Sequence, residues 1–370
     1  MKTARRLLFV GGGTVGHIAP LVAVVQAMHE QDASAQLYYA GSAADCASNA
    51  LDPVRPYIQL VKVPAGKLHR HLTWKQVGET GRILGGLVVA LWLLITIRPT
   101  QLFLKGGAAS VPFALWGGLL RIPIITHETD VAAGLANKIS AKVAKIICTA
   151  FPISFYADLP SERAIYTGQP VRDFFYEKRT DWPLEGEFER DPTLPLLVVT
   201  GGSQGARTLN QIVADALPSL LGKMQVVVQT GKLDYAGMGE RVAGLPKALR
   251  QNLYIAPFVT GEILAALFTQ ADVVITRSGG TIFELAASKS ASILIPLPTA
   301  AQDHQRKNAR QLEKVGAAIV LQQSGLTGEM LREAVELILE DAELRDGLTE
   351  KIAQFAKSDA ARQVAKQLLS

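Results

Sequence analysis

The segments LLFVGGGTVGH (7–17) and LLVVTGGSQGA (196–206) align without a gap, and they decide the fold. Each begins with four apolar residues, typical of a buried parallel strand, and continues into a glycine pair where a Cβ would clash. A hydroxyl residue and a further glycine then open a helix, whose free N–H groups and dipole attract a phosphate. The last positions differ, His17 against Ala206, so only the first copy offers a proton acceptor. We therefore expect two nucleotide-binding-type domains facing a shared cleft.

Short apolar runs alternate with helical stretches in both halves, which indicates an α/β fold of parallel sheets covered by helices on both faces. The expected strands are 7–10, 37–40, 102–104, 124–126 and 146–149, then 196–200, 226–229, 253–256, 273–276 and 293–296. We expect two Rossmann-like, doubly wound domains at 1–172 and 195–349, with a linker at 173–194. A helix at about 350–370 is expected to pack back on the first domain.

Composition excludes several classes of protein. A hydrophobic content of 48% with 19% charged residues is typical of folded globular domains. The two cysteines, Cys46 and Cys148, have no metal-ligand spacing, so neither a disulfide framework nor a zinc site is predicted. The net charge of +5 comes without a basic block, so we expect phosphates and anionic lipids as partners and no nucleic acid.

The longest apolar run, 83–97, is flanked by Arg82 and Arg98 and is too short to span a bilayer. One interpretation is a buried helix of the first domain. The other places one apolar face, including Trp92, at a membrane surface. The basic residues that would accompany it there are Lys67, Arg70, Lys75 and Arg82. Both interpretations can hold in part.

The sequence motifs do not fit the common nucleotide cofactors. Gly11, Gly13 and Gly16 match the dinucleotide fingerprint, but the strand that ends at Tyr38–Ser42 has no acidic residue for the ribose hydroxyls of NAD. No P-loop motif and no Asp-x-Asp pair occur in the chain. We therefore expect no cofactor and no essential metal. A sugar-nucleotide enzyme built on this chain would have to neutralise its leaving diphosphate with helix N-termini and an arginine.

Seven segments, taken together, resemble the MurG family of glycosyltransferases. They are GGGTVGHIAP (11–20), KGGAASVP (105–112), HETD (127–130), TGQPVR (167–172), TGGSQGARTLN (200–210), RSGGTIFELA (277–286) and IPLPTAAQDHQRKNA (295–309). The resemblance implies a GT-B fold, with an acceptor-binding, membrane-associated first domain and a UDP-GlcNAc-binding second domain. It implies inverting transfer of GlcNAc from UDP-GlcNAc to the C4 hydroxyl of undecaprenyl-diphosphate-MurNAc-pentapeptide (lipid I), forming lipid II in peptidoglycan synthesis.

The same resemblance implies partners and a location. UDP-GlcNAc and lipid I are the expected substrates, and the protein is expected to be peripheral on the cytoplasmic face of the cell membrane, against anionic lipids. Other proteins of cell-wall synthesis are further candidate partners.

The resemblance also implies the catalytic residues. His17 suits a general base for the acceptor hydroxyl, because an imidazole titrates near neutral pH; the alternative is a histidine that caps the turn or binds phosphate. His127 and Glu128 follow a strand at the carboxyl edge of the sheet. Three roles are open for this pair: orienting His17, serving as the base in its place, or a structural role. The glycines expected to hold the acceptor diphosphate are Gly12, Gly13, Gly106 and Gly107.

Donor contacts are carried over in the same way. Arg172 would steady the UDP leaving group, Glu284 the ribose, Val259 the uracil and Gln305 the donor sugar. The full expected donor set is Thr14, Val15, Gly16, Asp130, Arg172, Gly202, Ser203, Val259, Gly279, Gly280, Thr281, Glu284 and Gln305.

The chain departs from the family pattern at two places. Thr129 and Asp130 stand where the family commonly has Gln and Asn, and an aspartate keeps an acceptor oxygen but loses the amide donor. The turn before Glu284 is one residue shorter than in several family members. These departures keep open a non-catalytic nucleotide-sugar-binding membrane protein. Another GT-B lipid glycosyltransferase and a UDP-GlcNAc 2-epimerase also stay open, because they would share the second glycine turn and Glu284.

Overall fold

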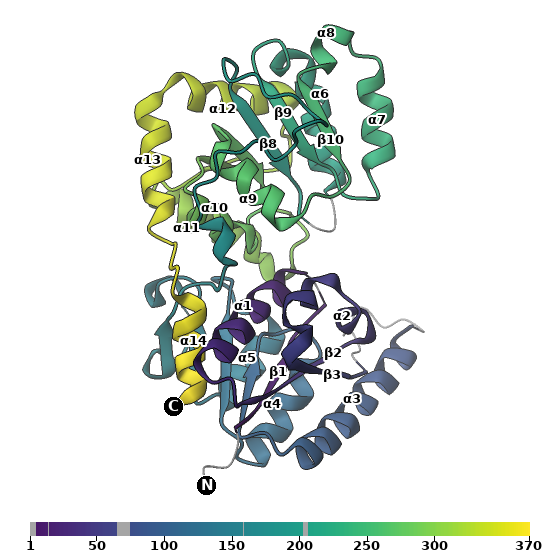
Figure 1. The fold of residues 1–370 in the computed structure, drawn as a ribbon, viewed down its shortest axis with the longest axis vertical. Helices are drawn as coiled ribbons and strands as arrows, with labels where there is room; N and C mark the ends of the chain where they lie inside the picture. The colour runs from purple at the N-terminus through teal and green to yellow at the C-terminus, as the bar shows by residue number, and fades with distance from the viewer. Residues whose placement is uncertain (1–4, 14, 65–74, 158, 203–205) are drawn as a thin grey trace. The chain divides into compact units, whose positions relative to one another are not determined.

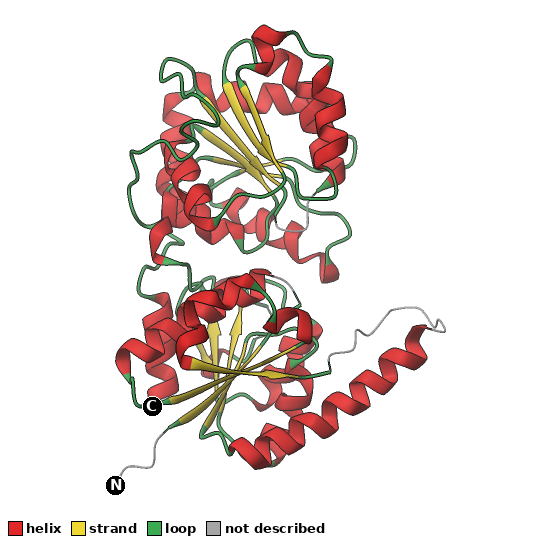
Figure 2. Ribbon diagram, turned by 45° about the vertical axis from the view of Figure 1, so that its right-hand side comes forward, coloured by secondary structure: helices red, strands yellow, loops and turns green. Residues whose placement is uncertain are grey.

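The chain forms two compact units in the computed structural model, which describes residues 5–13, 15–64, 75–157, 159–202 and 206–370 (Figure 1). The first unit combines Met1–Arg172 with Lys357–Ser370, and the second is Asp173–Ala356. In each unit, helices cover both faces of a parallel sheet (Figure 2). This is the two-domain α/β architecture that the repeated strand and glycine turn predict.

Seven parallel strands form the sheet of the first unit, within the part of the chain that the structure describes. In spatial order they are β3 (Ile58–Lys62), β2 (Gln36–Gly41), β1 (Arg6–Val10), β4 (Gln101–Leu104), β5 (Ile124–Glu128), β6 (Ile146–Thr149) and β7 (Ala164–Tyr166). The strand order reverses between β1 and β4. Ligands of open α/β sheets bind at such a switch point, outside the carboxyl ends of the strands.

Alternate residues of β1 serve the two faces of this sheet. Leu7 and Phe9 pack with helices α1 (Val15–Gln31) and α14 (Ala360–Leu369), and Leu8 and Val10 pack on the opposite side. The helices on that side are α3 (Lys75–Ile97), α4 (Ser110–Leu119) and α5 (Leu135–Val143). Shorter helices of this unit are α2 (Ala43–Cys46), η1 (Asn49–Tyr57), η2 (Ile153–Phe155) and η3 (Ser161–Arg163). A strand buried on both faces needs the continuous apolar run seen in the sequence.

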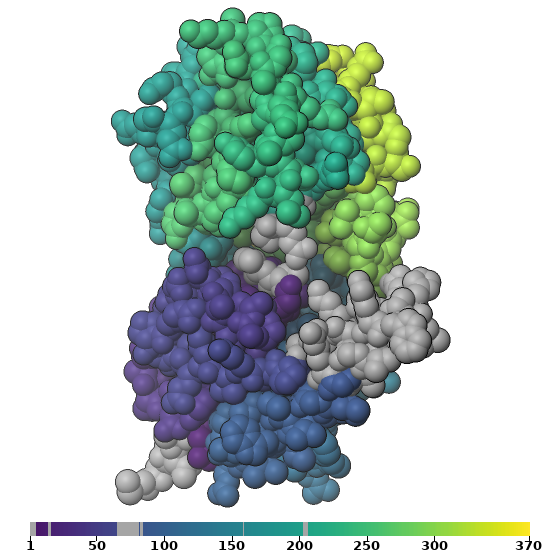
Figure 3. Space-filling model, turned by 90° about the vertical axis from the view of Figure 1, so that its right-hand side faces the viewer, coloured from purple at the N-terminus to yellow at the C-terminus, as the bar shows by residue number. Residues whose placement is uncertain are grey.

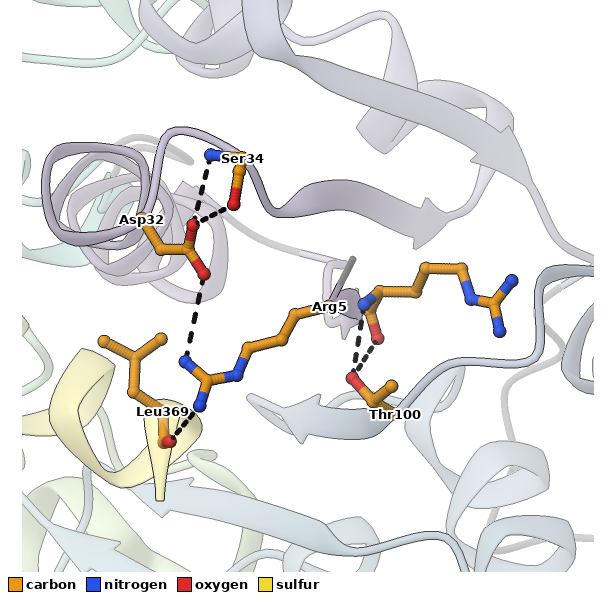
Figure 4. A network of polar contacts seen from close by, with 6 residues as sticks. Arg5, Asp32, Ser34, Thr100 and Leu369 are labelled. Atoms are coloured by element: carbon orange, nitrogen blue, oxygen red, sulfur yellow. Dashed lines mark hydrogen bonds and ion pairs between the residues drawn. The ribbon is translucent and has the colours of Figure 1, made fainter. Parts of the chain in front are cut away.

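The last helix of the chain is fixed to the first strand. Val364, Ala365 and Leu368 of α14 lie in the same core cluster as Leu7 and Phe9. A polar network closes the end of this contact (Figure 4): Arg5 Nη2 donates to Leu369 O over 2.8 Å, and Arg5 Nη1 lies 3.8 Å from Asp32 Oδ2. The C-terminal helix is therefore part of the first unit.

Six parallel strands form the sheet of the second unit, again counting only described residues. Their order is β10 (Leu253–Ala256), β9 (Gln225–Gln229), β8 (Leu196–Thr200), β11 (Val273–Thr276), β12 (Ser292–Leu294) and β13 (Ile319–Val320). The order reverses between β8 and β11, which gives this unit its own switch point.

Helices α6 (Arg207–Leu220), α7 (Tyr235–Ala243) and α12 (Gly328–Glu340) pack on one side of this sheet. The other helices of the unit are η4 (Asp173–Phe175), α8 (Lys247–Arg250), α9 (Gly261–Gln270), α10 (Thr281–Ser288), η5 (Ala301–Asp303), α11 (His304–Lys314) and α13 (Ala342–Ala353). The glycine-rich turn after β8 and the loop after β11 lie at the switch point of this sheet.

The stretch 173–194, expected to be a linker, is grouped with the second unit. Its apolar side chains Phe175, Leu184 and Phe188 are buried, and the Phe175 ring lies 6.2 Å from that of Phe268 on α9. Arg190 Nη1 also donates to Gln225 Oε1 over 2.9 Å. The stretch has no helical or strand period, but its aromatic residues still bury apolar surface.

Candidate functional site

Two glycine loops meet at the switch point of the first sheet. Gly12 and Gly13 follow β1 with φ of 150° and 91°, and Gly106 and Gly107 follow β4 with φ of 94° and 81°. A Cβ on Gly107 would lie 2.6 Å from Gly12 O, and a Cβ on Gly106 would lie 2.7 Å from Asn137 Oδ1. The two loops approach each other most closely at Gly107, where only glycine fits.

An aspartate that the sequence did not single out holds the first loop. Asp45 Oδ1 accepts a hydrogen bond of 2.8 Å from Gly13 N, and its other oxygen accepts from Ser42 N and Oγ in the capping box of α2. Gly13 N–H is therefore already occupied by a carboxylate. A diphosphate on this loop would use the remaining backbone donors of the loops and of the first turn of α1.

His17 lies in the first turn of α1, beside these loops, and is half-buried. Burial, and after it the charge of Lys105, lower the pKa of His17, while Asp130, a backbone hydrogen bond at Gly12, and Asp45 act in the opposite direction. The imidazole is therefore neutral at neutral pH. A neutral imidazole has the lone pair that a general base needs.

His127, the fourth residue of β5, is fully buried. Its Nε2 lies 2.9 Å from Gly168 O, which places the proton on Nε2. Burial first, and then Lys105, lower the pKa of His127 well below its ordinary value. These contacts favour the structural alternative for this histidine, because a ring held by a backbone carbonyl inside the sheet is closed to substrate.

Glu128 ends β5 and is nearly buried. Asp130 N donates to its Oε1 over 3.0 Å, and Asn137 Nδ2 donates to its Oε2 over 2.8 Å. Burial and then the charge of Asp130 raise the pKa of Glu128 to about 7, against these hydrogen bonds and the charge of Lys105. The carboxyl group is thus held in one orientation and titrates near neutral pH.

Lys105, between β4 and Gly106, is a second residue that sequence reasoning missed. Its Nζ donates to Thr129 Oγ1, and that hydroxyl donates to Gln169 Oε1 over 3.1 Å. Burial lowers the pKa of Lys105 to about 8, against the opposing charges of Glu128 and Asp130. Its position at the carboxyl end of a strand, directly before a glycine pair, was the signal that could have found it.

The loop after β11 forms the corresponding site in the second unit. Ser278 Oγ donates to Gln305 O over 2.8 Å, and Asn308 Nδ2 donates to Ser278 O over 3.0 Å. Gln305 Oε1 in turn accepts from Leu297 N over 2.9 Å. Open space surrounds Gly280, and only Gln305 Nε2, 4.0 Å away, approaches a Cβ built on Gly279, just before α10 begins at Thr281. Among the described residues, no side chain caps α10 by a hydrogen bond at Gly280, although Ile282 N and Phe283 N donate to Gly279 O and Gly280 O. The remaining N–H groups and the dipole of this helix end suit an anion.

Residues at neighbouring strand ends belong to the same site of the second unit. Val259 N donates to Gln229 Oε1 over 3.3 Å, and Glu284 lies in the first turn of α10. Arg277, which the sequence did not single out, donates to Ile295 O over 2.9 Å and to Gln323 Oε1 over 2.7 Å. Burial lowers the pKa of Arg277 to about 10, so it remains a cation at neutral pH.

The structure therefore gathers the expected residues into two clusters, each within one unit. The first contains Gly12, Gly13, Gly16, His17, Gly106, Gly107, His127, Glu128 and Asp130, and the second contains Gly202, Val259, Gly279, Gly280, Thr281, Glu284 and Gln305. Arg172 is the last residue of its segment of the first unit. Thr14, Ser203 and the side chain of Val15 lie outside the described residues.

Among the described residues, no group of three or more His, Cys, Asp and Glu side chains is arranged to hold a metal ion. No helix in the same part of the chain has the length and apolar character to cross a membrane.

Comparison with known proteins decides the family. Residues 7–149 match the glycosyltransferase family 28 N-terminal domain, and residues 196–368 match its C-terminal domain. A protein of Bacteroides thetaiotaomicron is 31% identical over 379 residues, covering 100% of this chain and 98% of that protein; its name is UDP-N-acetylglucosamine--N-acetylmuramyl-(pentapeptide) pyrophosphoryl-undecaprenol N-acetylglucosamine transferase. The chain belongs to the MurG family. A MurG relative of the same name from Syntrophotalea carbinolica is 34% identical, covering 91% of this chain and 90% of that protein.

Solved structures agree with the MurG assignment. MurG of Acinetobacter baumannii has a TM-score of 0.74 and 26% identity, with 99% of both chains covered. A structure described as a putative UDP-N-acetylglucosamine 2-epimerase from Listeria monocytogenes has a TM-score of 0.73 at 12% identity, with 99% of this chain and 96% of that chain covered. The epimerase likeness shows the fold alone. The predicted GT-B fold and MurG family membership are confirmed.

The contact between the glycine loops predicts a strict requirement at Gly107. Gly107→Ala should lower the free energy of unfolding by about 1–3 kcal/mol, because the added Cβ meets Gly12 O and φ is positive. Gly134→Ala is the matched control, since φ there is −64° and nothing lies within 4 Å. The control should be neutral or stabilising by up to about 1 kcal/mol in urea unfolding. Equal losses in both variants would contradict the contact.

The buried neutral His127 predicts a pH-dependent stability. Its pKa is depressed in the folded state, so its contribution is present above about pH 6.5 and is lost as the pH falls below that value. The free energy of unfolding of the wild type should then fall toward pH 5 more steeply than that of His127→Gln, by up to about 1.4 kcal/mol per pH unit. His29→Gln is the control, because it removes an imidazole from another place in the same unit. Parallel pH curves for wild type and His127→Gln would contradict the prediction.

Proposed function

We propose that this chain transfers GlcNAc from UDP-GlcNAc to the C4 hydroxyl of lipid I, with inversion and without an essential metal, and so forms lipid II of peptidoglycan synthesis. The observation that carries the proposal is similarity over the full length to relatives named for this transfer. In the reaction, the C4 oxygen bonds to the anomeric carbon of GlcNAc as the bond to UDP breaks, and the hydroxyl proton passes to the protein.

His17 is the base we propose for that proton. Its neutral imidazole beside the glycine loops supports the assignment. Glu128 is the second candidate, because its pKa of about 7 also suits proton transfer. We favour His17, since both carboxylate oxygens of Glu128 already accept hydrogen bonds from Asp130 N and Asn137. We assign His127 a structural role, because it is fully buried and its Nε2 donates to Gly168 O.

The acceptor diphosphate is assigned to the loops of Gly12, Gly13, Gly106 and Gly107. Two features support this: the loops lie at a switch point, and α1 begins there with its free N–H groups.

The donor is assigned to the second switch point. The diphosphate of UDP would lie at the N-terminus of α10, with Gly202, Ser203, Gly279, Gly280 and Thr281. Glu284 would accept from the ribose hydroxyls, the backbone of Val259 would read the uracil, and Gln305 would contact the sugar. Thr14, Val15, Gly16, Asp130 and Arg172 complete the proposed donor contacts.

Membrane association is proposed through α3 and α4. Leu84, Val88, Trp92 and Ile95 recur at helical spacing along α3 with 57–69% of their surface exposed, and Leu115 and Leu119 of α4 are also exposed. Helix α3 lies at the surface of the first unit, in blue in Figure 3. Its opposite face, with Ala90, Leu93 and Leu94, is buried in the core. Both interpretations of the apolar run therefore apply to one helix.

The basic part of this membrane surface is only partly described. Lys67 and Arg70, and the side chains of Lys75 and Arg82, lie outside the described residues. The exposed residues Arg98 and Arg121 follow α3 and α4 and would meet anionic lipid headgroups. We propose a peripheral location on the cytoplasmic face of the cell membrane, where other proteins of cell-wall synthesis are candidate partners.

An assay of UDP-GlcNAc with a lipid I analogue, with and without EDTA, tests the transfer and its independence of metal. We expect a disaccharide product in both conditions. His17→Ala should lower kcat by roughly 10²–10⁴, because general base catalysis supplies about that factor, while UDP-GlcNAc binding is retained. Unchanged turnover would exclude His17 as the base. Epimerised UDP-sugar, or UDP binding without any turnover, would instead favour an alternative function.

Vesicle binding tests the apolar surface of α3. Val88→Ser/Trp92→Ser should weaken binding to vesicles that contain anionic lipid at least tenfold, which corresponds to about 1.4 kcal/mol of lost apolar transfer. Leu337→Ser removes a similarly exposed leucine from the second unit and should bind as the wild type does. Equal binding by both variants would contradict the assignment.

A further inference from the structure

Lys105 is a buried cation to which the proposed mechanism gives no role. Only 1% of its surface is exposed, although lysine is almost never fully buried unless it is paired. It follows β4 directly and precedes Gly106, so its backbone belongs to the glycine loop of the site, while its side chain is buried. A buried charge of this kind needs partners that offset its loss of hydration.

The ammonium is fixed by residues from neighbouring strand ends. Nζ donates to the hydroxyl of Thr129, which follows β5, and this hydroxyl donates to Gln169, which follows β7. Because the hydroxyl proton is directed to Gln169, an oxygen lone pair of Thr129 is turned to the lysine. All three side chains are buried, so the chain of hydrogen bonds has one arrangement.

Two acidic residues flank the residue that anchors this lysine. Glu128 and Asp130 lie on either side of Thr129, and Asp130 N donates to Glu128 Oε1 over 3.0 Å. The charge of Asp130 also raises the pKa of Glu128, after burial, and a nearby cation offsets this repulsion. Lys105 is near both, since its charge interacts with each of them.

We propose that Lys105 is a positioning residue for the transfer reaction: its ammonium, fixed by Thr129 and Gln169 at the end of β4, is the counter-charge around which Glu128, Asp130 and His17 are arranged. The inference rests on the proposed function of His17 as the base. It gives Lys105 no contact with substrate.

The charged groups that act on His17 come from several elements. Lys105, after β4, lowers the pKa of His17, whereas Asp130, after β5, and Asp45, in α2, raise it. Near Lys105, burial raises the pKa of Cys148 to about 12, and burial also keeps the pKa of Tyr156 well above its ordinary value, so both stay neutral. Loss of the lysine charge should therefore raise the pKa of His17 and of Glu128 together.

The test uses the full chain with Lys105→Met, which keeps the length of the side chain and removes its charge. The chain has six histidines, so the His17 imidazole can be assigned in NMR spectra with a His17→Gln variant. We expect the titration midpoint of His17 to rise by roughly one pH unit. The ascending limb of kcat/KM against pH should move with it, which lowers kcat/KM about tenfold on that limb, while the Kd for UDP-GlcNAc is unchanged.

Two variants separate charge from packing. Lys105→Met/Asp130→Asn removes one charge of each sign, so the midpoint should return toward the wild-type value. Lys145→Met, an exposed lysine of the same unit, should titrate as the wild type does. If Lys105→Met does not fold but the double variant does, the counter-charge role is supported; if neither folds, packing is the cause and the proposal is overturned.

Two further results would overturn the inference. One is an unchanged titration midpoint of His17 in Lys105→Met. The other is a titration midpoint of His17 that rises as far in Lys105→Met/Asp130→Asn as in Lys105→Met. The NMR titration of His17 does not depend on enzymatic turnover. If the wild type gives no transfer to a lipid I analogue but the midpoints shift as expected, the proposed function fails while the arrangement around Lys105 stands.

Discussion

The close approach of two backbones at the first switch point is the constraint on which the site depends. Lys105 N donates to Val10 O over 2.8 Å, which extends the sheet one residue beyond β4, and Gly107 then passes against Gly12 O. No side chain fits between the two backbones. The functional side chains therefore lie around the loops: His17 on α1, Asp45 on α2, and Glu128 at the end of β5. The glycines thus determine where the chemistry-bearing residues can be.

The charge balance around these loops is unusual for a place expected to hold a diphosphate. Asp45, Glu128 and Asp130 are acidic, and an anion would be repelled by them. The N-terminus of α1 and the buried ammonium of Lys105 act in the opposite direction. Burial and then the charge of Asp130 raise the pKa of Glu128 to about 7, and burial and then the charge of Lys105 lower the pKa of His17, so the site contains groups that exchange protons near neutral pH.

Sequence patterns were enough for the architecture and for the glycine loops, because buried parallel strands and glycine turns have strong local signals. They did not reveal β3, β7 or β13, which are short or partly exposed strands toward the sheet edges. They also missed Asp45, Lys105 and Arg277. The importance of these three depends on which strand ends become neighbours, and spacing along the chain does not encode that. The roles carried over from the family for His17, Glu284 and Gln305 stay predictions.

The central claim is that the acceptor binds at the glycine loops of the first unit and the donor at the loop before α10. Amide hydrogen exchange of the full chain, with a lipid I analogue and separately with UDP, tests it most directly. The account predicts protection at Gly11–Gly13 and Gly106–Gly107 with the analogue, and at Arg277–Thr281 with UDP. Protection by the analogue confined to other segments, with these loops exchanging as in the free protein, would contradict it.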